Sequence, residues 1–206
     1  MLAIIDYQVG NLLSIQNMLF KIGKRDVVIT NEEDDIIQAE KIIIPGVGHF
    51  DYGISKLRNA PFFETLNHRV INEKVPVLGI CLGAQLLLEK SEEGNLPGLG
   101  WLKGGSVKFD TSKMNEDLKV PHMGWSEVEK LKESRLLTGL PEDPRYYFVH
   151  TYHFHCQNPE HHLLKATYGY DFIAAFESDN ILGVQFHPEK SHRFGMQILK
   201  NFITQY

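Results

Sequence analysis

The first half of the chain alternates short apolar segments with segments of helical spacing, and this alternation constrains the fold more than any other feature. Four apolar runs lie at residues 2–7, 26–30, 41–45 and 75–80. Helical segments at 12–22, 32–40 and 51–73 separate them, and a further helix is expected at 82–90. Runs that are apolar along their whole length are typical of strands covered on both faces. The pattern predicts an α/β fold with a doubly wound, mainly parallel sheet.

The second half of the chain has a different pattern. Short runs rich in β-branched and aromatic residues, with turn residues between them, lie at 106–109, 125–130, 146–155, 163–167, 172–177 and 181–185. We expect these runs to form antiparallel strands that extend one edge of the sheet. The last segment, 193–206, has an apolar helical face. Because no linker divides the chain, residues 1–206 are predicted to form a single domain.

Composition excludes several classes of protein. The chain has 21 Lys and Arg against 26 Asp and Glu, so its formal charge of -5 provides no basic field for nucleic acid. No segment approaches the roughly 20 apolar residues of a transmembrane helix, and the N-terminus has no basic leader. With only two cysteines, Cys81 and Cys156, a disulfide framework is excluded. We therefore expect a cytoplasmic protein that binds neither nucleic acid nor a membrane.

The most informative local motif is a strand that turns directly into a helix around Cys81. The segment Gly79-Ile-Cys81-Leu-Gly83 follows an apolar strand and has the G-x-C-x-G pattern of a nucleophile elbow. At such a turn the side chain projects above the carboxyl end of the sheet, and the helix N-terminus favours a thiolate. Cys81 is therefore a candidate nucleophile. The alternative, a buried structural cysteine, does not account for glycine on both sides.

A cysteine nucleophile needs a base, and the base needs a group that orients it. His187-Pro188-Glu189 lies at the end of an extended run, where residues two apart face the same way. Because Pro188 restricts the backbone between them, His187 and Glu189 are expected side by side, with His187 accepting the thiol proton. Alone, a His and a Glu two apart are equally consistent with a solvated loop. Together with the elbow, they predict a triad.

A third segment is a candidate oxyanion site. Gly46-Val47-Gly48 follows the apolar run at 41–45, so it is expected at the same carboxyl edge as Cys81. Glycines there allow the unusual backbone geometry that directs an N–H group inward, where it would stabilise a developing negative charge. Judged by itself, the segment is equally consistent with an ordinary strand-to-loop turn.

These three motifs, in this order, resemble the class I (triad) glutamine amidotransferases, whose fold is flavodoxin-like. The motifs that carry the resemblance are Gly79-Ile-Cys-Leu-Gly-Ala-Gln85, Pro45-Gly-Val-Gly48 and Gly183-Val-Gln-Phe-His-Pro-Glu-Lys-Ser191. Within the family, Val120-Pro-His-Met-Gly-Trp125, Phe148-Val-His150 and Asp6-Tyr-x-x-Gly-Asn11 are similar to the glutaminase subunits of imidazole glycerol phosphate synthase. The similarity covers nearly the whole chain.

The resemblance implies a role for each matching residue. Cys81 would attack the side-chain amide of L-glutamine, His187 would transfer protons and Glu189 would orient His187. The oxyanion hole would involve Gly46, Val47 and Leu82. The resemblance also implies contacts to the substrate glutamine from Gly48, Gln85, His150, Thr151 and Tyr152, and contacts to a partner subunit from His122, Met123 and Trp125.

The implied partner is a (β/α)8-barrel cyclase or synthase subunit that forms a heterodimer with this chain. It would combine the ammonia released from glutamine with a phosphoribosylated precursor to give imidazole glycerol phosphate and AICAR in histidine biosynthesis. Three departures from the usual pattern, His49, Ala84 and the His192 segment, instead resemble paralogues that supply ammonia for amidination of a surface-polysaccharide sugar. The acceptor of the ammonia therefore stays open between these two readings.

A cluster of histidines and a cysteine is a further candidate for chemistry. His150, His153, His155 and Cys156 invite a metal interpretation, but alternation along one strand would place His153 and His155 on the face opposite His150 and Cys156. We therefore expect no metal site and no cofactor.

A cysteine peptidase and an inactive regulatory subunit are alternatives to the glutaminase. The Gln85 and His-Thr-Tyr elements argue against the peptidase, and the complete triad argues against the inactive subunit.

Overall fold

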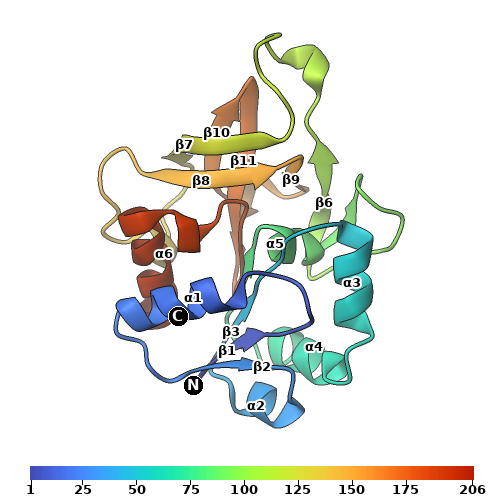
Figure 1. Ribbon diagram of the computed structural model, residues 1–206, viewed down its shortest axis with the longest axis vertical. Coiled ribbons are helices and arrows are strands. Elements are labelled where there is room, and N and C mark those ends of the chain that lie inside the picture. Colours follow the sequence, from blue (N-terminus) through green and yellow to red (C-terminus); the bar gives the residue numbers. More distant parts are fainter.

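The computed structural model describes residues 1–206 and contains one branched sheet of twelve strands (Figure 1). Its main path runs β2-β1-β3-β4-β12-β11-β10-β7-β8. These strands are β2 (Val27–Thr30), β1 (Leu2–Ile5), β3 (Lys41–Ile44), β4 (Val77–Ile80), β12 (Ile181–Val184), β11 (Tyr170–Ser178), β10 (His162–Tyr168), β7 (His122–Lys130) and β8 (Arg145–His150). The first five are parallel to one another, and the remainder are antiparallel. The expected doubly wound sheet with an antiparallel extension is confirmed.

The parallel strands are covered on both faces because successive side chains point in opposite directions. Leu2 and Ile4 face a core formed with α1 (Leu12–Lys21) and α6 (His192–Gln205). Ala3 and Ile5 face a second core, formed with three helices on the other side (Figure 1). These helices are α2 (Glu33–Gln38), α3 (Phe50–Arg58) and α4 (Phe63–Ile71). This arrangement explains why the strands are apolar throughout.

A side branch of the sheet was not expected from the sequence. β9 (Tyr152–Cys156) pairs with both β11 and β6 (Leu102–Lys108), and β6 pairs in turn with β5 (Leu88–Ser91). Three short 3-10 helices, at Thr111–Lys113, Arg135–Leu137 and Pro159–His161, connect strands, and a fourth, Pro188–Lys190, lies between β12 and α6. No helix is long and apolar enough to cross a membrane.

Three expected elements have different bounds in the structure. The helix expected at 82–90 is α5 (Leu82–Leu86), and the chain then enters β5, which pairs with the next strand, β6. The helical stretch at 51–73 is divided into α3 and α4 at Pro61, which has no N–H to continue a helix. The run at 146–155 is divided at Thr151, where β8, paired with β7, gives way to β9, paired with β6.

Candidate active site

Cys81 lies between the end of β4 and the start of α5, as the elbow motif predicts. Its backbone has φ 53° and ψ -114°, a conformation that non-glycine residues rarely adopt. Two close backbone contacts hold the turn: a Cβ at Gly83 would overlap the carbonyl oxygen of Ile44, and a Cβ at Gly79 would lie 2.5 Å from Cα of Ala84. Backbone strain of this kind is characteristic of functional sites and persists only where the surrounding structure enforces it.

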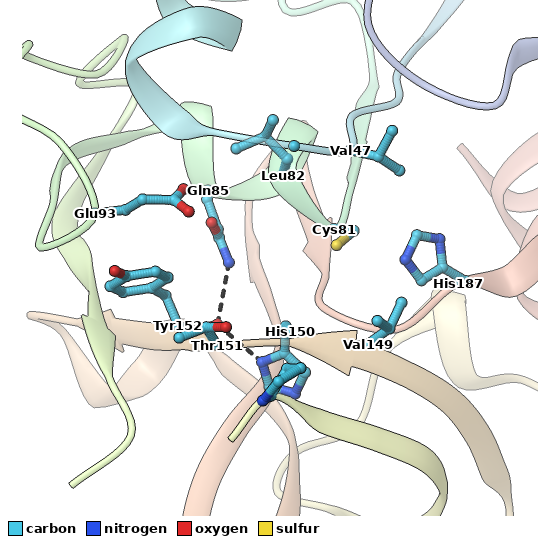
Figure 2. Close-up of a pocket in the computed structure, with 12 residues that line it drawn as sticks. Val47, Cys81, Leu82, Gln85, Glu93, Val149, His150, Thr151, Tyr152 and His187 are labelled. Carbon is cyan, nitrogen blue, oxygen red and sulfur yellow. Dashed lines mark hydrogen bonds between the residues drawn. The ribbon is translucent and has the colours of Figure 1, made fainter. Parts of the chain in front are cut away.

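His187 and Glu189 reach the same edge of the sheet from the neighbouring strand. β12 pairs in parallel with β4, with Gly183 opposite Gly79, so the residues after the two strands lie side by side. Nδ1 of His187 lies 2.8 Å from Oε1 of Glu189, and both side chains are 2% exposed. The Ser191 hydroxyl donates to the carbonyl of His187 at 2.6 Å and fixes the turn that joins them. The structure therefore brings the expected pair together, and Figure 2 shows His187 of this pair beside Cys81.

The electrostatics of this group favour a protonated His187. Burial alone would lower the pKa of His187, but hydrogen bonding and charge from Cys81 and Glu189 outweigh burial and raise the pKa to about 10. Its Nε2 is buried and has no hydrogen-bond partner within the chain, and Cys81 lies beside the ring (Figure 2). An imidazolium next to a thiolate is the arrangement that activates a cysteine and supplies a proton to a leaving group.

The segment after β3 lies directly against the elbow. β3 pairs with β4, with Ile44 opposite Gly79, and a Cβ at Gly46 would lie 2.5 Å from the backbone N of Gly83 and 2.9 Å from Cβ of Leu82. Gly48 has a φ of 105°, which favours glycine. The three residues expected at the oxyanion hole, Gly46, Val47 and Leu82, are thus adjacent. The first N–H groups of a helix, such as that of Leu82, have no partner within the helix.

Tyr7 supports this segment, and although it belongs to the Asp6-Tyr-x-x-Gly-Asn11 motif, the sequence analysis assigned it no role. Its hydroxyl donates to the carbonyl of Pro45, and its side chain is 3% exposed. Burial, and secondarily the charge of Cys81, raise the pKa of Tyr7, so the phenol stays protonated and can donate. Its place in that motif and at the end of the first apolar run, 2–7, was the available signal, because a buried tyrosine is expected to find a hydrogen-bond partner.

A cavity of about 290 Å³ opens above Cys81 (Figure 2). It is near the lower end of the range for small-molecule sites. Its lining residues are Val47, Gly48, Cys81, Leu82, Gln85, Glu93, Pro121, Val149, His150, Thr151, Tyr152 and His187. All five residues that the resemblance places around the substrate are among them. Segments far apart in sequence, from the elbow, the loop after β3 and the junction of β8 with β9, meet there.

Comparison with known proteins identifies the family. The family model described as glutamine amidotransferase class-I matches residues 3–206. The chain belongs to this family. A glutamine amidotransferase is an enzyme. The elbow, the His187–Glu189 pair and the cavity lie at the carboxyl edge of the sheet, where doubly wound folds build their sites.

Curated relatives of this amidotransferase share its whole length. The imidazole glycerol phosphate synthase subunit HisH 2 of Methanococcus maripaludis is 48% identical over 100% of both chains. The protein of the same name in Pseudomonas aeruginosa is 47% identical over 98% of both chains.

Solved structures share the fold of this amidotransferase at low identity. PurLQS from Thermotoga maritima has a TM-score of 0.71 at 19% identity, covering 99% of this chain and 97% of that one. The glutaminase domain of Trypanosoma brucei CTPS has a TM-score of 0.65 at 14% identity, covering 98% of this chain and 93% of that one.

Glu93 is a lining residue of the amidotransferase cavity that sequence reasoning missed. It is the only acidic side chain in the lining, and its Oε2 accepts a hydrogen bond from the backbone N of Phe50 at 2.8 Å. Glu92-Glu93 follows β5, whose strand conformation was not expected, so its position relative to the cavity could not be read from the sequence.

One of the three residues expected at a partner interface is not on the surface. Met123 and Trp125 are 62% and 44% exposed, but His122 is 2% exposed, and its Nδ1 lies 3.0 Å from Nε2 of His150. The placement of His122 at an interface is therefore corrected to the interior of the amidotransferase. The reason is alternation along β7, which directs His122 inward and Met123 outward.

The histidines at the junction of β8 and β9 are not divided between two faces of one strand as expected. Because the chain changes strand at Thr151, His150 and His153 both pack against Phe109, with ring centroids 5.2 and 4.9 Å from it. His155, on the same strand as His153, is exposed. No group of three or more His, Cys, Asp or Glu side chains in residues 1–206 is placed to hold a metal ion.

Proposed function

We propose that this chain is the glutaminase subunit of an imidazole glycerol phosphate synthase, hydrolysing L-glutamine to glutamate and ammonia. The observation that carries the proposal is a cysteine in a strained strand-to-helix turn, facing a histidine whose pKa is raised, within one small cavity. Relatives 47 and 48% identical that bear the name of this synthase support the choice of reaction.

In the proposed reaction, the Cys81 thiolate attacks the side-chain carbonyl carbon of glutamine and a C–S bond forms. The oxyanion is stabilised by backbone N–H groups around Gly46, Val47 and Leu82. His187 gives its Nε2 proton to the nitrogen, the C–N bond breaks and ammonia leaves. Water then attacks the thioester, His187 accepts a proton from it, and the C–S bond breaks to release glutamate. Glu189 holds the imidazole throughout.

We further propose which residues hold the substrate. The carboxylate of Glu93 is the single negative group in the lining and is placed to attract the α-ammonium of glutamine. Gly48, Gln85, His150, Thr151 and Tyr152 form further parts of the cavity wall around the ligand.

The partner in this proposal is a (β/α)8-barrel cyclase subunit that receives the ammonia within a heterodimer and forms imidazole glycerol phosphate and AICAR. The exposed side chains of Val47, Met123 and Trp125 provide apolar area for this contact. Such a pathway would operate in the cytoplasm.

The amidination of a polysaccharide sugar is the second candidate, supported by one structural feature. His192, a departure from the usual pattern, stacks on Trp125 with ring centroids 5.5 Å apart and planes 3° apart. The surface proposed for the partner therefore includes a residue typical of the paralogues. The names of the relatives favour the histidine pathway over this alternative.

The test is to measure glutamate formation from glutamine by the chain alone, and then with candidate barrel subunits and their ligands. We expect little turnover alone and strong stimulation by the barrel of the histidine pathway. Stimulation only by a barrel of the sugar pathway would support the second candidate. Hydrolysis of esters or peptides without glutamate formation would overturn both.

Labelling tests the nucleophile directly. A glutamine-like electrophile is expected to modify the chain once, and Cys81→Ser is expected to abolish the modification. Cys156 provides an internal control, because its thiol is buried and burial raises its pKa to about 12.

A further inference from the structure

A continuous series of hydrogen bonds connects β7 with the cavity. Oγ of Ser126 lies 2.9 Å from Nε2 of His122, and Nδ1 of His122 lies 3.0 Å from Nε2 of His150. Nδ1 of His150 lies 2.8 Å from the carbonyl oxygen of Tyr152. His122 and His150 are directly opposite each other in the β7–β8 ladder, which explains how the two rings meet.

The series continues from Tyr152 to the sulfur of Cys81. Nε2 of Gln85 donates to the carbonyl of Tyr152 at 3.1 Å and to Oε1 of Gln185 at 3.0 Å. Nε2 of Gln185 lies 3.7 Å from Sγ of Cys81. Gln185 is fully buried, and Gln85 is 4% exposed where it lines the cavity. We call the whole series, Ser126–His122–His150–Tyr152–Gln85–Gln185–Cys81, the histidine relay.

Only one set of proton positions satisfies every contact in the relay. The carbonyl of Tyr152 can only accept, so Nδ1 of His150 carries a hydrogen, and Nε2 of a neutral His150 must accept. Nδ1 of His122 therefore donates to it, Nε2 of His122 accepts, and the Ser126 hydroxyl donates. On the other side, both hydrogens on Nε2 of Gln85 are used, and the amide of Gln185 is oriented with its N–H toward sulfur.

The surroundings keep both imidazoles neutral. His122 stacks on Tyr168 and on Phe148, with centroids 4.1 and 5.0 Å away, and Phe172 contacts both histidines. Burial lowers the pKa of His122 to about 4 and that of His150 to about 3. An apolar environment of this kind also strengthens hydrogen bonds and makes an unpaired member costly.

We propose that the histidine relay positions two amides for the glutaminase reaction, with Ser126, His122, His150 and Gln185 as positioning residues. Gln85 is left with Oε1 as its only free polar atom, so it meets the substrate as an acceptor for an N–H group. Gln185 presents an N–H to the sulfur and stabilises its negative charge. This inference rests on the proposed glutaminase function, and it assigns the buried His122 a task inside the enzyme.

A pair of substitutions at His122 separates positioning from packing. In His122→Phe a ring of similar size remains, but His150 loses the donor that holds its tautomer. His150 can then carry its hydrogen on Nε2, which places a bare Nδ1 against the carbonyl of Tyr152. In His122→Asn the side chain is smaller, but its amide N–H₂ can still donate to His150. A packing role predicts more damage from Asn, and a relay predicts more damage from Phe.

The experiment measures protection of Cys81 by glutamine against alkylation with iodoacetamide, using the full chain and subtracting the rate of Cys81→Ser. We expect His122→Phe to raise the half-protecting glutamine concentration about fivefold, the effect of one hydrogen bond. His122→Asn is expected within about twofold of wild type, and Ser126→Ala is expected to raise the concentration by about two- to threefold because only the outer donor is lost.

A second measurement needs no glutamine. Gln185→Glu has nearly the same shape as the wild type but replaces the N–H near sulfur with a carboxylate oxygen. The titratable groups around the sulfur are His187, Glu189 and Tyr7, and all of them are retained. We expect the pH midpoint of alkylation to rise by about one unit in this variant, since a nearby like charge disfavours the thiolate.

The outcomes distinguish failure of the relay from failure of the proposed function. The relay would be overturned by equal half-protecting glutamine concentrations in wild type and His122→Phe. It would also be overturned if this concentration rose more in His122→Asn than in His122→Phe. If His122→Phe does not fold, an unchanged value in Ser126→Ala overturns it instead. If glutamine does not protect even the wild type, the glutaminase proposal fails, and an unchanged midpoint in Gln185→Glu then overturns the relay as well.

Discussion

His187 and His150 line the same cavity, but their surroundings have opposite effects on their charge. His187 lies beside a carboxylate and a thiol, which raise its pKa to about 10. His150 lies among Phe109, Phe148 and Phe172, and burial lowers its pKa to about 3. The first histidine is therefore charged at neutral pH and the second is neutral.

The difference shows that the neighbours of a buried histidine decide what it can do. His187 stores a proton next to a reacting sulfur, as general acid–base chemistry requires. His150 has two nitrogens of fixed and opposite hydrogen-bonding character, which suits it to orient other groups. Two predictions test this contrast and a third tests whether the outer face of β7 acts separately from the cavity, in order of decreasing effect.

The largest effect is expected when the charge beside His187 is removed. Glu189→Gln keeps the shape of the side chain but cannot stabilise an imidazolium, so the pKa of His187 should fall. We expect kcat for glutamine in the stimulated complex to drop on the order of 10²- to 10⁴-fold, the typical contribution of general acid–base catalysis. Steady-state kinetics check this. A loss smaller than tenfold, or a change confined to KM, would show that Glu189 does not act through His187.

The second prediction concerns stability in acid. Between pH 6.5 and 3 an unfolded chain binds a proton at residue 150 that the folded chain does not, so the free energy of unfolding falls as pH falls. The expected loss from His150 between pH 7 and pH 5 is about 2 kcal/mol. His187 has the opposite sign, because its contribution is complete below about pH 6.5 and is lost as pH rises through about 10.

Urea denaturation at pH 7, 6 and 5 measures this loss. His150→Asn is the control, since it cannot titrate, and its free energy of unfolding should depend less steeply on pH than that of the wild type. Parallel curves for the two proteins would mean that His150 is not held neutral.

The smallest effect is expected at the surface. Trp125→Ala removes an exposed ring on β7 that lies three residues after the buried His122 and faces outward. We expect the affinity for the barrel partner to weaken about tenfold, or about 1.4 kcal/mol. Glutamine protection of Cys81 in the free chain should be unchanged. Calorimetric titration with the partner measures the first quantity, and a change in protection would contradict the separation of the two sides of β7.

The three triad residues could be predicted because their geometry is local. Cys81 follows a strand and precedes a helix, and His187 and Glu189 are two residues apart across a proline, so the backbone itself directs these side chains. Glu93 and Tyr7 could not be predicted in the same way. Glu93 reaches the cavity only because β5 pairs with β6, and Tyr7 acts through Pro45, which lies 38 positions away.

His122 shows where a motif was informative but was interpreted wrongly. The Pro-His-Met-Gly-Trp segment does lie beside the cavity, but alternation along β7 separates its residues between the interior and the surface. The face that is buried depends on β8 and β10 on either side of the strand and on the aromatic rings beneath it. Those contacts come from segments of the chain outside β7.

Short segments of sequence were enough to predict the parallel core, the elbow at Cys81 and the pairing of His187 with Glu189. Each of these depends on hydrophobic periodicity or on backbone geometry over a few residues, which local interactions impose. The branch through β5, β6 and β9, the burial of His122 and the course of the histidine relay became apparent only in the folded chain. These depend on which strands pair and which rings surround a polar atom, and such contacts exist only after the chain has folded.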